Sequence, residues 1–154
     1  MLKKAEEQSM RWSDKCMLEL THHNLFENDE HRSRFRDLLE CYSEAPFFTK
    51  GLCKCMYLSA MDDEHFLVML EVLNAMALDK SRDTQFMSDQ RQELEDTWNT
   101  DDQIIVRLSD AWLNNQAYEI PFGSMTEAGA YIIRRGLEAA DIINDIFDKA
   151  LGQS

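Results

Sequence analysis

Apolar residues recur every three to four positions along almost the whole chain, and long stretches of strict alternation are missing. This spacing is typical of amphipathic helices rather than strands. The pattern predicts a first helix over about residues 2–25 and a second that begins after Asn28 or Asp29. The second helix ends before Pro46, which disfavours the helical conformation of the residue before it. A third helix is then predicted to begin at Pro46, where proline suits the first turn.

Four further helices follow in the remaining two thirds of the chain. One begins near Asp62 and is apolar on most sides, so we expect it at the centre of the bundle. A mostly polar helix follows over about residues 83–98. Two capping-box patterns, in which a hydroxyl residue precedes Gln or Glu by three positions, open the last two helices. These patterns are Thr100-x-x-Gln103 and Ser124-x-x-Glu127, and the final helix reaches about residue 150. The predicted fold is an all-α, compact helical bundle of about six to seven helices in one domain, 1–154.

Composition agrees with a packed helical domain. The chain has 154 residues, 44% of them hydrophobic, with only five Gly and two Pro, too few for a turn-rich sandwich or barrel. Its net charge is −13, and the charge is uneven. Residues 1–60 carry 9 Lys and Arg against 10 Asp and Glu, whereas residues 61–154 carry 7 against 19. The chain therefore has a near-neutral part followed by a strongly acidic part, which often indicates a surface that faces a partner.

This charge argues against direct binding to DNA, RNA or an anionic membrane. No apolar run is long enough to span a bilayer, and no apolar stretch follows the first lysines as in a secretory signal. We therefore expect a cytoplasmic protein whose four cysteines are reduced thiols. Cys16 and Cys55 are expected as small core residues.

Catalytic and metal chemistry find little support in the sequence. Glu19-x-x-His22 resembles half of a di-iron ligand set, and Asp62-x-x-His65 is its only approximate counterpart. Cys53-x-Cys55 lacks the spacing of a zinc knuckle. We assign no catalytic residue, cofactor or metal ligand and lean away from an enzyme. A metal-binding helical bundle, di-iron-like or zinc, is the alternative hypothesis, and the pattern leaves open whether any histidine binds metal: His22, His23, His31 or His65.

Rows of acidic residues are the most specific feature of the sequence. Like charges three or four residues apart destabilise a helix, and acids near its C-terminus oppose the helix dipole, so local stability does not explain them. Binding to a cationic partner would explain them better. The predicted partner-binding residues, with Trp98 as the aromatic anchor, are Asp89, Glu93, Asp96, Trp98, Asp101, Asp102, Glu138, Asp141, Asp145 and Asp148.

The predicted function is therefore a non-catalytic acidic module that binds a positively charged protein partner. A narrower version is an inhibitor that mimics nucleic acid through its carboxylate rows and occupies a nucleic-acid-binding protein. Self-association as a homodimer is compatible with both. The stripe formed by Leu67, Glu71, Asn74 and Leu78 marks an interface if it is exposed.

Overall fold

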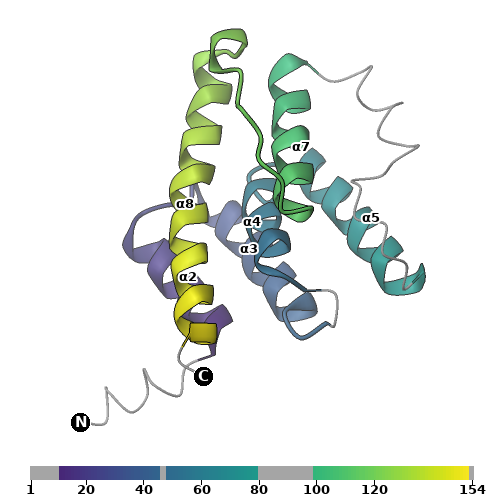
Figure 1. Ribbon diagram of the computed structural model, residues 1–154, viewed down its shortest axis with the longest axis vertical. Helices are drawn as coiled ribbons and strands as arrows, with labels where there is room; N and C mark the ends of the chain where they lie inside the picture. The colour runs from purple at the N-terminus through teal and green to yellow at the C-terminus, as the bar shows by residue number, and fades with distance from the viewer. Residues whose placement is uncertain (1–10, 46–47, 80–98, 153–154) are drawn as a thin grey trace.

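The computed structural model describes residues 11–45, 48–79 and 99–152 and is all-helical over these ranges (Figure 1). The described elements are α2 (Trp12–His22), α3 (Asp29–Tyr42), α4 (Lys50–Ser59), α5 (Asp63–Asp79), α7 (Thr100–Leu113), the 3₁₀ helix η1 (Phe122–Ser124) and α8 (Glu127–Gly152). The predicted all-α bundle is confirmed. The helix predicted over residues 83–98 lies outside the described residues.

Helix α4 forms the centre of the bundle. It packs against α3, α5, α7 and α8, while α2 packs against α8. Leu52, Cys53, Cys55 and Met56 are fully buried, so α4 is covered on opposite faces. The prediction that the helix beginning near Asp62 is central is wrong. Leu67 on α5 is 61% exposed, because α5 packs along one side of α4 instead of being surrounded.

The longest helix, α8, runs along the long axis of the molecule (Figure 1). Its inner side carries Ile133, Ala139 and Ile143, all fully buried. Gly136 lies on this side as well, where an added Cβ would stand 3.1 Å from Leu58 Cδ1 of α4. The small residue therefore serves close packing within the chain.

The first described helix ends earlier than the predicted boundary at residue 25. Asn24 adopts a left-handed conformation, with φ of 55°. The Leu25 amide donates to Leu20 O at 2.9 Å and the Asn24 amide donates to Thr21 O at 3.0 Å. These two bonds form a Schellman motif, which stops the helix and brings two buried leucines together. The same arrangement ends α7 at Asn115, whose φ is 54°.

Side-chain caps set the starts of the helices. Of the two predicted candidates, Asn28 and Asp29, Asn28 caps α3 by accepting from the His31 amide at 2.8 Å. Asp62, near which the next helix was predicted to begin, accepts from the His65 amide at 2.8 Å. Pro46, the predicted start of the third helix, lies outside the described residues. Helix α4 begins at Lys50, where the Thr49 hydroxyl accepts from the Leu52 amide at 3.1 Å.

Both predicted capping boxes are displaced. Asn99, not Thr100, caps α7 by accepting from the Asp102 amide at 2.9 Å. Thr126, not Ser124, caps α8 by accepting from the Gly129 amide at 3.1 Å. Ser124 instead belongs to the 3₁₀ turn that precedes α8.

The cysteines divide into three that are buried and one that is not. Cys16, Cys53 and Cys55 are fully buried, and Cys41 is exposed. The expected core positions of Cys16 and Cys55 are confirmed. The Cys55 thiol donates to Ser109 O at 3.0 Å, and burial raises its pKa to about 12. Among the helices of the described ranges, none combines the length and the hydropathy that crossing a bilayer requires.

Candidate functional site

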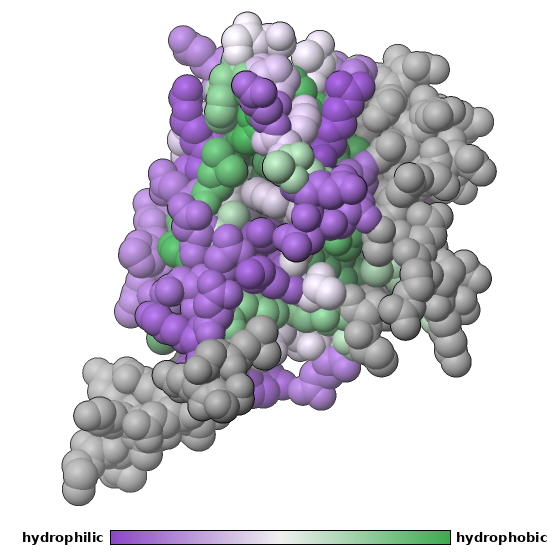
Figure 2. All heavy atoms as spheres, in the orientation of Figure 1, coloured by the Kyte–Doolittle hydropathy of each residue, from purple (hydrophilic) through white to green (hydrophobic). Residues whose placement is uncertain are grey.

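The C-terminal two thirds of α8 carry the acidic row predicted from the sequence. Its members, spaced by 3, 4 and 3 residues, are Glu138, Asp141, Asp145 and Asp148. All four are exposed, and their spacing places them along one side of the helix. Figure 2 shows hydrophilic side chains along most of α8 and the neighbouring α2, with apolar atoms visible between them.

Lysines accompany this row without covering it. Lys149 Nζ lies 3.0 Å from Asp145 Oδ2, and Lys50 Nζ of α4 lies 3.5 Å from Asp148 Oδ1. In both pairs each side chain is at least 40% exposed, so each pair contributes little to stability. Such pairs can be exchanged for a partner's cations at small cost.

Asp101 has a structural role at the start of α8. Its carboxylate accepts from the Thr126 amide at 3.1 Å and from the Thr126 hydroxyl. An added Cβ at Gly129 would collide with this carboxylate, so glycine leaves room for it. Asp101 thus fixes the residue that caps α8 and joins the start of α7 to the start of α8.

Asp102 also points into the fold. Its Oδ1 lies 3.0 Å from Nε2 of His65, a side chain that is only 5% exposed. Asp62 Oδ2 lies 3.9 Å from the same nitrogen. The Asp102 carboxylate therefore supplies a hydrogen-bond partner for the buried His65 imidazole between α5 and α7.

The other predicted partner-binding residues cannot be placed on this surface. Asp89, Glu93, Asp96 and Trp98 lie outside the described residues. Of the ten residues predicted, the structure therefore brings four together in one exposed row on α8. It places two others, Asp101 and Asp102, in contacts within the chain.

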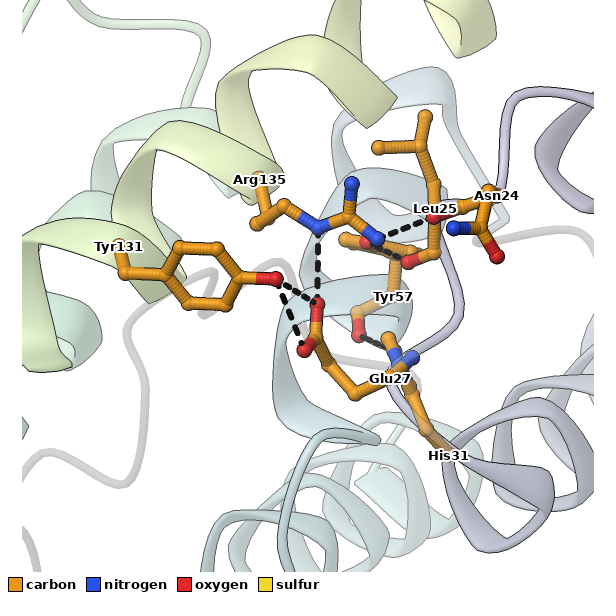
Figure 3. Close-up of polar contacts among 7 residues, drawn as sticks. All are labelled: Asn24, Leu25, Glu27, His31, Tyr57, Tyr131 and Arg135. Atoms are coloured by element: carbon orange, nitrogen blue, oxygen red, sulfur yellow. Dashed lines mark hydrogen bonds and ion pairs between the residues drawn. The ribbon is translucent and has the colours of Figure 1, made fainter.

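A polar cluster links the upper part of α8 to the loop that follows α2 (Figure 3). Arg135 Nε donates to Glu27 Oε1 at 2.8 Å, and the Tyr131 hydroxyl donates to Glu27 Oε2 at 3.2 Å. Arg135 also donates to Asn24 O. Burial opposes the charge of Arg135, but the hydrogen bond and attraction of Glu27 outweigh it and raise the pKa of Arg135. We call Asn24, Glu27, Tyr131 and Arg135 the loop clamp.

Behind the loop clamp, His31 is completely buried. Its Nδ1 accepts from the Glu27 amide at 3.1 Å, so Nε2 carries the proton and donates to Tyr57 O at 3.0 Å. Burial lowers the pKa of His31. The Tyr57 hydroxyl donates to Leu25 O, and burial raises its pKa. Both rings therefore serve as uncharged hydrogen-bonding parts of the core.

The metal hypothesis required Glu19 and His22 to meet the pair Asp62 and His65. Glu19 lies on α2 beside His23, with 3.8 Å between Oε2 and Nε2, whereas His65 contacts Asp102 of α7. Within the described ranges, no group of three or more His, Cys, Asp or Glu side chains is placed to hold a metal ion.

Comparisons with known proteins add no relative. No protein-family model matches the chain, and neither the curated proteins nor the solved structures give a match.

The loop clamp was not predicted from the sequence. Glu27 and Arg135 are separated by more than one hundred residues, and neither stands in a motif. Two contacts between arginines of α8 and aromatic rings were not predicted either. Arg134 lies 5.4 Å from the centre of the Phe122 ring in η1, and Arg135 lies 5.8 Å from that of Tyr131 in α8. The i, i+4 spacing of Tyr131 and Arg135 on one helix was the available signal for the second contact.

Proposed function

We propose that the protein is a non-catalytic binding module that uses the exposed acidic row of α8 to engage a positively charged protein partner. The observation that carries this proposal is the contrast between exposed and engaged carboxylates. Asp101 and Asp102 are held by the fold, while Glu138 and Asp141 are exposed at the middle of α8.

Electrostatics supports this assignment. Four carboxylates on one side of a helix create a negative potential that speeds encounter with a cationic surface and orients it. The row also opposes the dipole of α8, because Asp145 and Asp148 lie in its last two turns. Residues that disfavour their own helix and make few contacts within the chain are better explained by a partner.

The test is capture of partners from a nuclease-treated lysate of the source organism in about 150 mM salt. The variant Glu138→Gln, Asp141→Asn, Asp145→Asn removes three charges from the row. The control Glu30→Gln, Asp37→Asn, Glu40→Gln removes three charges from exposed positions on α3. We expect basic proteins to be captured by the wild type and the control and lost with the α8 variant.

Equal capture by the two variants would contradict the proposal, because net charge alone would then explain binding. Displacement of a captured protein by duplex DNA would favour the narrower function, mimicry of nucleic acid. A homodimer formed through the row is distinguished by sedimentation of the purified protein with and without the α8 substitutions.

A further inference from the structure

A groove runs between α2 and α8 beside the acidic row. Its volume is about 350 Å³, within the range of sites that hold ligands or anchoring side chains. Leu18 of α2 and Ile142 and Ile146 of α8 supply its apolar lining. Leu18 is 39% exposed, which is unusual for a leucine that faces a neighbouring helix.

The charges around the groove are distributed unequally between its walls. On the α2 wall, Lys15 stands against Glu19, which leaves that wall nearly neutral. On the α8 wall, Asp145 belongs both to the groove and to the acidic row. The excess negative charge of this wall comes from Asp141 and Glu138, which continue the row one and two turns beyond the groove. Lys149 is the cation on that wall and already pairs with Asp145.

The loop clamp ties the loop after α2 to α8 next to one end of this groove. His23, which lines the groove, is followed directly by Asn24, and Arg135 binds both Asn24 O and Glu27. The loop after α2 is thereby fastened to α8, so the spacing of the two helices is fixed before any partner arrives. A preformed groove avoids the ordering cost that a flexible site incurs on binding.

We infer that this groove receives an amphipathic basic helix of the partner, whose apolar side chains contact Leu18, Ile142 and Ile146 while its cations face the carboxylates of α8. The inference rests on the proposed function and specifies the form of the partner. An apolar floor with charge on one wall is the arrangement that binds helices in grooves, with anchors spaced at i, i+3 or i+4 and i+7. The residues that line the groove run from Lys15 to His23 along α2 and from Ile142 to Lys149 on α8, a length of about 11 Å, or about two turns of a bound helix.

The experiment uses two labelled peptides of about 18 residues with identical composition, Leu, Lys and Arg with Ala spacers. In the first, the leucines form one helical face; in the second, the order is scrambled so that no apolar face exists. Binding to the full chain is measured by fluorescence anisotropy. We expect the amphipathic peptide to bind at least about tenfold more tightly than the scrambled one.

Matched leucine variants locate the binding. Leu18→Glu is expected to weaken binding of the amphipathic peptide at least about tenfold, and Leu18→Ala about threefold to fivefold. Leu67→Glu, at a 61% exposed position on α5 outside the groove, is expected to change the affinity for this peptide less than about twofold. Circular dichroism of each variant verifies folding, and Leu18→Ala keeps the test decisive if Leu18→Glu does not fold.

The outcomes separate the groove from the acidic row. Equal binding of the two peptides, lost in the α8 charge variant, would overturn the groove while supporting the proposed function. Binding that Leu18→Glu abolishes but the α8 charge variant leaves unchanged would overturn the proposed function, because the cations would then be irrelevant. Binding of neither peptide, or equal loss with Leu18→Glu and Leu67→Glu, would overturn the inference.

Discussion

The two ends of α8 use the same kinds of charged residue in opposite ways. At its start, Asp101, Glu27 and Arg135 are tied to backbone groups or to each other, and they fasten α7 and the loop after α2 to the helix. Towards its end, Asp141, Asp145 and Asp148 are exposed, and each has an exposed or half-buried lysine near it. Residue type therefore does not determine whether a charge holds the fold or is available to a partner. Burial and hydrogen bonding do.

Removing the cation of the loop clamp should give the largest effect. Arg135→Ala leaves Glu27, whose side chain is 26% exposed, without its ion pair and Asn24 O without its donor. We expect a loss of about 2–3 kcal/mol in the free energy of unfolding, measured by urea denaturation. The matched variant Lys149→Ala breaks an exposed pair on the same helix and should cost less than about 0.5 kcal/mol. Equal losses would show that the charged residues at the two ends of α8 contribute equally to stability.

Asp101→Ala should have the next largest effect. The substitution removes both acceptors that position Thr126, so the cap of α8 weakens and we expect a loss of about 1–2 kcal/mol. Asp101→Asn retains one acceptor oxygen and should lose less. A urea midpoint for Asp101→Ala as high as that of Asp141→Ala would argue against a structural role for Asp101.

The buried histidine behind the loop clamp predicts a dependence of stability on pH. Because the pKa of folded His31 is lowered, the unfolded chain binds the proton first as pH falls below about 6.5. The contribution of His31 to stability is complete above that pH. It is lost on acidification with a slope of at most about 1.4 kcal/mol per pH unit.

The measurement is urea denaturation between about pH 7.5 and 5.5, compared with His31→Gln. Glutamine can donate to Tyr57 O but does not titrate, so its stability curve should be flatter. Curves with the same slope would exclude His31 as the source. His22 and His23 are exposed and lie outside this hydrogen-bond network.

The smallest expected effect lies on the acidic row. Asp141→Asn relieves repulsion with Glu138 and Asp145 and reduces the conflict with the helix dipole. We expect the free energy of unfolding to rise by a few tenths of a kcal/mol, more at low salt than at high salt. A loss of more than about 1 kcal/mol would mean that Asp141 supports the fold, contrary to the comparison.

The helices were predictable from the chain because apolar spacing repeats wherever one side of a helix is buried. Their starts were less predictable, since capping residues cluster: Asn99 precedes Thr100, and Ser124 stands two positions before Thr126. At α8 the choice depends on Asp101, which belongs to another helix. Local sequence could not supply that contact.

Which helix is central, and which carboxylates are engaged by the fold, could likewise be seen only in the structure. The segment around Leu67 has more apolar residues than a helix with one buried side requires, and this suggested a central position that α4 occupies instead. Asp101 and Asp141 look alike as members of acidic rows. Only the position of Thr126 separates the one that caps a helix from the one that faces solvent.

The burial of three of the four thiols means that their reaction rates report how often the fold opens. Cys41 should react with a thiol reagent at once, whereas the other three cysteines are sealed between α2, α4 and the helices around them. Burial raises the pKa values of Cys53 and Cys55, so almost no thiolate forms there in the folded chain. Mass spectrometry of timed alkylation would therefore show one fast adduct and then slow ones, whose rates report how often α2 and α4 separate.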